Sequence, residues 1–287
     1  MPVPELPEVE TVVRGLNETV KGRTLGKVRL NAPPASVVVS GSFKPAKLDK
    51  QLEGRKILNV TRRGKNILIA LSGDVTLWAH LKMTGKFRWV EADRPTDKHD
   101  LMIAEMSSNG KKSAEGRRQL RFNDYRRFGR LRLFPNDELW LQKGLAELGP
   151  EPLEIDAGQF YDLLHARSRM IKPALMDQSF IVGIGNIYAD ESLWAARINP
   201  HRLTNSISRK KLEDLHAHIQ RLLRFSIENM GTTVDSYSGV NGQTGQFQKY
   251  LLVYGREGEL CDRCGSTIVR EKIGSRSAHY CRKCQRA

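Results

Sequence analysis

The chain has 287 residues, more than one ordinary hydrophobic core accommodates, so we expect two domains. Hydrophobic residues make up 39% and charged residues 28%, a balance that excludes a disordered chain. Lys and Arg number 47 against 32 Asp and Glu, a net charge of +15, which favours nucleic acid as the partner over a merely soluble basic surface.

The sequence contains neither a membrane span nor a signal peptide. No apolar run approaches the ~20 residues that a spanning helix needs, and the start lacks the basic and apolar regions of a signal sequence. We therefore expect a cytoplasmic protein without a membrane partner. All 4 cysteines lie in the last 27 residues, and a reducing compartment favours metal ligands over disulfides.

The first half of the chain predicts one helix followed by strands. Apolar residues at helical spacing begin at Val9 and continue to Val20, with a stop near Gly22. Short runs separated by turn residues then predict a β-sandwich or barrel. The predicted strands cover residues 24–30, 56–62, 66–71, 75–81, 86–90, 101–106 and 119–134.

The segment from Leu148 to Leu153 contains a glycine and two prolines and marks the domain boundary. The later chain is mainly helical, and its clearest helix runs from Arg209 to Asn229. Residues 236–248 are rich in Gly and small polar residues and predict a mobile loop, either a plain connector or a substrate-closing lid. We expect domains at 1–149, 150–258 and 259–287.

The last of these domains carries the most specific local motif. Cys261 and Cys264 are separated by sixteen residues from Cys281 and Cys284, a spacing that presents four thiolates to one tetrahedral Zn²⁺. The segment between the pairs contains Arg270, Lys272, Arg276 and His279. It is therefore a basic hairpin that could hold DNA, although a purely structural zinc ribbon fits the same spacing.

Two further motifs are weaker by themselves. The turn at 183–191, Gly-Ile-Gly-Asn-Ile-Tyr-Ala-Asp-Glu, leads into a helix, and its glycines would let backbone N–H groups approach a phosphate. A tight turn between helices would need the same glycines. The opening at 4–10, Pro-Glu-Leu-Pro-Glu-Val-Glu, alternates prolines with carboxylates, which also suits the first turn of a helix.

Taken together, the motifs resemble the formamidopyrimidine-DNA glycosylase family along essentially the full chain. The resemblance rests on the opening, the glycine turn, the cysteines with Arg276, and four further motifs. These are Arg-Arg-Gly-Lys at 62–65, His-Leu-Lys-Met-Thr-Gly at 80–85, Asp-Tyr-Arg-Arg-Phe-Gly at 124–129 and Leu-Gly-Pro-Glu-Pro-Leu at 148–153.

The resemblance implies an α+β fold of two domains. A β-sandwich with a flanking helix would be followed by a helical helix-two-turns-helix domain that ends in a Cys₄ zinc-finger β-hairpin. It also implies base-excision repair of duplex DNA, in which an oxidised purine such as 8-oxoguanine or a formamidopyrimidine is flipped out and excised. We expect a monomer associated with the bacterial nucleoid and holding one structural Zn²⁺.

In the family, the amine of an N-terminal proline attacks the sugar, and the resulting iminium drives elimination of both flanking phosphates. Carried over by motif, Glu5 would protonate the sugar ring oxygen and Glu8 would support the site. Lys65 would anchor a phosphate or assist proton transfer, and Arg276 would clamp the backbone and serve elimination.

The resemblance also predicts the residues that contact DNA. Met83, Arg126 and Phe128 would fill the gap left by the flipped base, although Met83 and Phe128 could equally be core residues. Phosphates or the surroundings of the lesion would be held by Lys172, Asn186 and Tyr188, and the motif positions His80 and Arg127 belong to the same surface.

One feature departs from the family pattern, because Met1, Pro2 and Val3 precede the motif proline, Pro4. Three alternatives follow. Pro2 could fold back and act as a displaced nucleophile, since two residues reach about 7 Å. Trimming could instead expose the Pro4 amine. Alternatively, the protein binds damaged or abasic DNA without ordinary excision.

Overall fold

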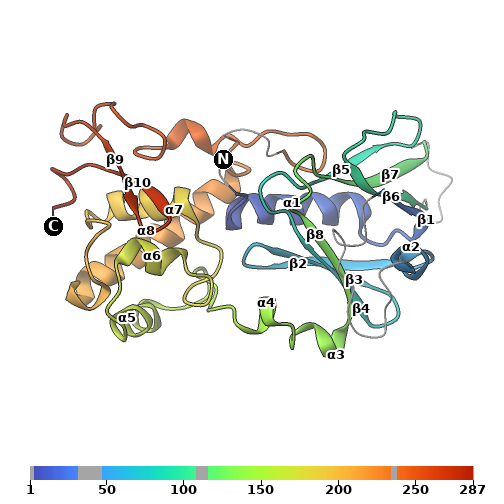
Figure 1. Cartoon of the computed structure of the whole chain (residues 1–287), viewed down its shortest axis with the longest axis horizontal. Helices are drawn as coiled ribbons and strands as arrows, with labels where there is room; N and C mark the ends of the chain where they lie inside the picture. The colour runs from blue at the N-terminus through green and yellow to red at the C-terminus, as the bar shows by residue number, and fades with distance from the viewer. Residues whose placement is uncertain (1–2, 32–46, 108–115, 234–237, 287) are drawn as a thin grey trace.

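The computed structural model describes residues 3–31, 47–107, 116–233 and 238–286, which form two lobes lying side by side (Figure 1). The first lobe is a sandwich of two antiparallel four-stranded sheets. One sheet has the order β2 (Ile57–Arg63), β3 (Asn66–Leu71), β4 (Val75–His80) and β8 (Arg130–Pro135). The other has the order β1 (Leu25–Leu30), β6 (Asp100–Met106), β7 (Arg118–Asn123) and β5 (Lys86–Glu91).

Apolar side chains from both sheets form one core, which is the reason that alternating sequences fold here as a sandwich. Three short helices lie at its edges: α2 (Leu48–Leu52), α3 (Asn136–Leu139) and α4 (Lys143–Ala146). The predicted fold class of a β-sandwich followed by a helical domain is confirmed.

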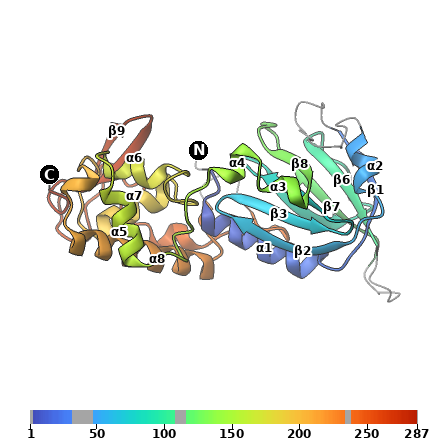
Figure 2. The ribbon, with the colours of Figure 1, turned by 90° about the horizontal axis from the view of Figure 1, so that it is seen from below.

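The flanking helix α1 (Leu6–Val20) joins the two lobes, and Figure 2 shows it running along one side of the sandwich. Its residues from Val9 to Val20 pack into the sandwich core, as the helical spacing predicted. Leu6 instead packs into the core of the second lobe. The first turn of α1 therefore carries Glu5 and Glu8 into the junction between the lobes.

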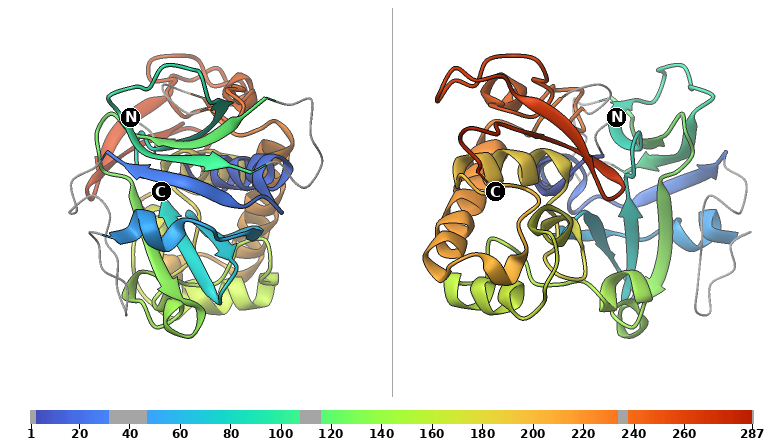
Figure 3. Two further views of the ribbon diagram at one scale, coloured as in Figure 1. Left: turned by 90° about the vertical axis from the view of Figure 1, so that its right-hand side faces the viewer. Right: turned by 60° about the vertical axis from the view of Figure 1, so that its left-hand side comes forward.

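The second lobe is built from α5 (Ala157–His165), α6 (Ile171–Met176), α7 (Asn186–Ala195) and α8 (Arg209–Glu228). Two 3₁₀ turns, η3 (Thr204–Ser206) and η4 (Phe247–Tyr250), complete it. The C-terminal hairpin of β9 (Val269–Ile273) and β10 (Arg276–Tyr280) packs against α7 and faces the junction (Figure 3). In the described parts of the chain, no helix is long and apolar enough to cross a membrane.

Two sequence-based predictions need correction. The predicted strand at 119–134 is two strands, β7 and β8, which belong to different sheets. Asp124 directly follows the first of them and accepts the backbone N–H of Gly129 at 2.7 Å, and Arg127 between the strands has a φ of 57°. This closed turn lifts its side chains out of the sandwich, which period-2 patterning cannot reveal.

The predicted mobile loop at 236–248 also differs from expectation. Residues 236 and 237 lie outside the described part of the chain. Beyond them, Val240 is buried in the sandwich core, and its carbonyl accepts the N–H of Trp89 at 3.0 Å. Phe247 is buried in the other core and begins η4. Two buried apolar side chains thus anchor the described part of this segment, which its glycine content had predicted to be mobile.

Candidate active site

The carboxylate of Glu5 lies at the amino end of α7, inside the junction. It accepts the backbone N–H of Gly185 at 2.7 Å and that of Ile187 at 2.9 Å. A Cβ on Gly185 would stand 2.4 Å from Glu5 Cδ, so only glycine leaves room. The glycine turn expected to receive a phosphate holds Glu5 instead, because unpaired N–H groups at a helix start bind any close anion.

Burial gives Glu5 an unusual acidity. Its side chain is 2% exposed, and this desolvation raises its pKa to about 7, although the nearby Lys65 ammonium and the two N–H donors oppose the shift. Near neutral pH this carboxyl exists both with and without its proton. Such a group can donate a proton in a reaction and recover it afterwards.

Glu8 forms a buried network one turn further along α1. It accepts the Tyr188 hydroxyl and the N–H of Thr232, both at 2.7 Å, and the N–H of Glu5 at 2.8 Å. Burial raises the pKa of Glu8. Tyr188, which we expected beside DNA, is 1% exposed and also bonds Ser226 at 2.5 Å. In this structure Tyr188 donates to Glu8, and Glu8 in turn accepts the backbone N–H of Glu5, so Tyr188 helps to position Glu5.

Lys65 enters the same junction from the turn between β2 and β3. Its ammonium donates to the carbonyl of Ile184 at 2.9 Å, and burial lowers its pKa while the Glu5 carboxylate opposes the shift. Buried Glu151 fixes the turn by accepting Arg63 at 3.1 Å and the N–H of Gly64 at 2.6 Å. Glu151 stands in the linker motif, so the two lobes share this anchor.

Two adjoining cavities open beside these groups, with volumes of about 800 and 300 Å³. They bring together most of the predicted site residues from both lobes and the hairpin. The larger is lined by Lys65, His80, Met83, Phe128, Lys172 and Arg276, and the smaller by Glu5, Lys65, Asn186 and Arg276.

Val3 lines both cavities, and Pro4 behind it is buried with its nitrogen in the Val3–Pro4 peptide bond. Pro2 lies outside the described residues. Asn186 begins α7, and its Oδ1 has no hydrogen-bond partner among the described residues. In this chain the Pro4 nitrogen is therefore an amide, and Val3, which precedes it, forms part of the wall of both cavities.

Two loops present the side chains predicted to enter a base stack. Asp124 accepts the Thr84 hydroxyl and the N–H of Arg126, which ties the loop of Met83 to the loop of Phe128. Phe128 is 46% exposed, and the Arg126 guanidinium lies 4.8 Å from its ring centroid. Phe128 is thus not a core residue. Asp124 is the single acid among six arginines between residues 117 and 130, a signal that the sequence offered.

His80 and Arg127 stand at the edges of this region. Arg127 is exposed. The His80 Nδ1 accepts the N–H of Lys82 at 3.0 Å. Burial, together with the charges of Lys82 and Lys65, lowers the pKa of His80 to about 3. His80 is therefore neutral near pH 7 and can only donate through Nε2.

The hairpin is docked by an acid that sequence reasoning did not single out. Asp190 on α7 pairs with the Lys172 ammonium at 2.6 Å, and both side chains are 1% exposed. It also accepts the N–H of His279 at 2.9 Å, while Lys172 donates to the carbonyl of Ser277. This network sets the position of the exposed Arg276 at the start of β10. Lys172, expected at a phosphate, lines the larger cavity beside it.

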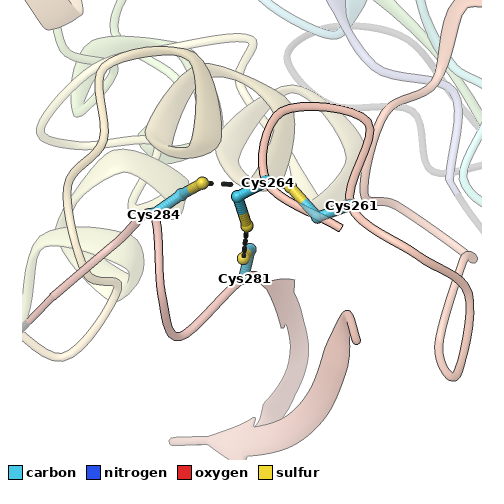
Figure 4. A group of neighbouring side chains, drawn as sticks. All are labelled: Cys261, Cys264, Cys281 and Cys284. Atoms are coloured by element: carbon cyan, nitrogen blue, oxygen red, sulfur yellow. Dashed lines mark hydrogen bonds between the residues drawn. The ribbon is translucent and has the colours of Figure 1, made fainter. Parts of the chain in front are cut away.

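The four cysteines converge at the base of the hairpin (Figure 4). Their sulfur atoms all lie within 4.8 Å of one another, and two pairs stand at 3.5 and 3.9 Å. A tetrahedron with Zn–S bonds of about 2.3 Å has edges of about 3.8 Å, so the cluster fits Zn²⁺. The Trp194 indole N–H points at Cys261 Sγ at 3.4 Å. The predicted structural zinc site is confirmed.

Comparison with known proteins agrees with this architecture. Family models match the formamidopyrimidine-DNA glycosylase N-terminal domain at residues 3–131, the corresponding H2TH domain at 148–238 and the zinc finger found in FPG and IleRS at 258–287. The formamidopyrimidine-DNA glycosylase of Pelotomaculum thermopropionicum is 43% identical, with 99% of each chain covered. That of Bacillus subtilis is 38% identical over the same shares.

Solved structures give the same result. Wild-type Lactococcus lactis Fpg bound to DNA containing an N7-benzyl-Fapy-dG superposes with a TM-score of 0.88 at 34% identity, covering 99% of this chain and 100% of that one. A complex of Lactococcus lactis Fpg with abasic DNA gives the same TM-score, identity and coverage.

Proposed function

The chain belongs to the formamidopyrimidine-DNA glycosylase family, and on that premise we propose that it excises oxidised purines from duplex DNA and cuts the strand at the resulting abasic site. The names of the relatives support the substrate class, and the net charge of +15 supports a polyanionic partner. One chain carries every group the proposal uses, so a monomer suffices.

The observation that carries the proposal is the buried Glu5 carboxyl, whose pKa is raised to about 7. A general acid works best when its pKa is close to the working pH. Glu5 would protonate the sugar ring oxygen as an amine attacks C1′. The glycosidic bond breaks, the base leaves with the electron pair and takes up a proton, and the opened sugar remains as an iminium.

Loss of a C2′ proton from that iminium expels the 3′ phosphate, and a second elimination expels the 5′ phosphate. Both ends of the gap then carry phosphate monoesters. Lys65, which lies beside Glu5 and has a pKa lowered by burial, is suited to relay these protons. Arg276, Lys172 and Asn186 would hold the backbone at the two cavities.

We assign the amine to Pro4. Its neighbour Glu5 supports this, as does the family match, which begins at residue 3. The Val3–Pro4 peptide bond ties up the Pro4 nitrogen and Val3 lines both cavities, so the amine acts once residues 1–3 are removed, by initiation at codon 3 with loss of the initiator or by proteolysis. An α-amino group titrates at roughly 7.7 to 8.0, which leaves a useful unprotonated fraction.

Met83, Arg126 and Phe128 would occupy the gap left by the flipped base, with His80 and Arg127 on the adjacent backbone. Their loops are fixed by Asp124, so the wedge is preorganised. Tyr188 acts from inside by positioning Glu8.

The test is borohydride trapping on a duplex containing 8-oxoguanine, with two chains compared. One spans residues 1–287, and the other begins at Pro4 after removal of the initiator. An adduct that forms with the shorter chain and maps to Pro4 supports the proposal. An adduct of the longer chain on Pro2 would replace Pro4 by Pro2.

Tight binding of abasic DNA without an adduct from either chain would leave damage recognition as the function. The position of Val3 in both cavities favours that second candidate for the untrimmed chain. Mass determination of the N-terminus in the natural host would then decide which chain exists there.

A further inference from the structure

A third cavity, of about 300 Å³, extends from the large one along strands β4 and β8. We call it the β8 cavity. Its walls include Trp78, Lys82, Arg130 and Arg132, and Lys82 and Arg130 also line the larger cavity, so the two spaces are continuous. Neither Lys82, Arg130 nor Arg132 has a part in the proposed reaction.

The β8 cavity concentrates positive charge without an acid to balance it. Arg130 and Arg132 are two residues apart on β8 and so point to the same face. They pair across the sheet with His80 and Trp78 of β4. Among the described residues that line the cavity, none is acidic.

The cations also lack salt bridges. Within the described ranges, no ion pair involves Lys82, Arg130 or Arg132. Burial and the charges of the two arginines lower the pKa of Lys82, and burial and Arg130 lower that of Arg132. Like charges are thus held together with no protein group to neutralise them.

Arg132 also has a hydrogen-bond donor without a partner in the described part of the chain. Its guanidinium carbon lies over the Trp78 ring, 4.9 Å from the ring centroid. Its Nε is buried and has no hydrogen-bond partner among the described residues. A buried donor left unpaired is unfavourable, so an N–H group without an acceptor marks a place for a ligand oxygen.

We propose that the β8 cavity binds a phosphate group of the DNA in the cleft, held by Arg132, Arg130 and Lys82. A phosphate supplies both the negative charge and the acceptor oxygens, and guanidinium groups match its geometry. The inference rests on the proposed function. It leaves two sources for the phosphate: an internal phosphodiester of the bound strand, or a terminal monoester left after elimination.

The first experiment measures the salt dependence of binding to a duplex with a tetrahydrofuran abasic analogue, which cannot be excised. Each cation that contacts a phosphate contributes about one unit to the slope of log affinity against log salt. We therefore expect Arg132→Gln and Lys82→Gln each to flatten the slope by about one unit. Lys82 is exposed in a turn, so its variant tests the site even if Arg132→Gln unfolds.

Lys27→Gln is the matched control. Lys27 is exposed on β1, at the end of the sandwich away from α7 (Figure 1), and its loss should leave the slope unchanged. Slopes of the Arg132 and Lys82 variants that equal the Lys27 control would overturn the proposal. This assay needs no turnover. If the unsubstituted protein is inactive but the Arg132 and Lys82 variants still flatten the salt slope, the excision proposal is wrong and the phosphate site in the β8 cavity stands.

The second experiment separates the sources. A duplex with a one-nucleotide gap is compared with phosphate or hydroxyl groups at both gap ends. If a terminal monoester occupies the cavity, the unsubstituted protein binds the phosphate form several-fold more tightly and Arg132→Gln removes that preference. If an internal phosphodiester occupies it, the variant weakens both forms equally. If the unsubstituted protein and Arg132→Gln both bind the phosphate and the hydroxyl duplexes with the same affinity, the proposal is overturned.

Discussion

Replacing Glu5 by Gln removes a buried carboxyl whose pKa is raised to about 7 by desolvation. The folded protein binds this proton with a pKa of about 7, against 4.5 in the unfolded chain. The stability contributed by proton binding is therefore fully present below pH 4.5 and is lost as the pH rises through 7. At about 1.36 kcal/mol per pKa unit, the loss amounts to roughly 3 kcal/mol.

Glu5→Gln has no such titration, so the difference in unfolding free energy between the two proteins should change by about 3 kcal/mol from pH 4.5 to 8. A constant offset is also expected, because the amide NH₂ faces the N–H of Gly185 or Ile187. Urea unfolding across this pH range measures the change separately from the offset. A difference that stays flat with pH would refute the raised pKa.

The same variant tests the chemistry. In the chain that begins at Pro4, Glu5→Gln should abolish excision of 8-oxoguanine while abasic DNA is still bound, because Glu5 lies inside the junction and the other cavity-lining side chains are unchanged. For the unsubstituted chain that begins at Pro4, single-turnover excision should be fastest at about pH 7.5, between the pKa of Glu5 and the pKa of the amine, and should decline at higher pH as Glu5 loses its proton. Full excision by Glu5→Gln would exclude Glu5 as the proton donor.

Three further outcomes are expected. Gly185→Ala places a Cβ 2.4 Å from Glu5 Cδ and should lower single-turnover excision by about 100-fold, because a displacement near 1 Å can cost that much; an unchanged rate would contradict the geometry. Asp190→Asn leaves the Lys172 ammonium buried and unpaired and should cost about 3–5 kcal/mol in urea unfolding. Metal analysis should find one zinc per chain, and chelation should expose the β9–β10 hairpin to protease and weaken DNA binding, since the hairpin carries Arg276.

The sequence predicted the elements whose side chains repeat with a clear period. The stripe from Val9 to Val20 on α1 and the helix beginning at Arg209 are examples, and the strand at 66–71 was predicted with its observed bounds. The cysteine spacing predicted the zinc site because four thiolates converge only through two short turns. These features depend on local pattern alone.

Features that depend on distant partners could not be predicted. Glu151 and Asp190 each fix a turn or hairpin through a backbone N–H group far along the chain, and Asp124 ties two loops together by accepting the distant Thr84 hydroxyl. Nothing in the residues next to them reveals those partners. The short helix α6 was also missed, because it is held by packing against α7 rather than by a long amphipathic stripe.

The glycine turn shows how a correct motif received the wrong partner. Free N–H groups at the start of α7 do bind an anion, but the anion is Glu5, 180 residues earlier in the chain. Leu6, next to it, belongs to the core of the second lobe. The acid is therefore buried, and its pKa raised, only when both lobes are folded against each other. Neither lobe alone contains the site, so the cleft and the acidity of Glu5 form together.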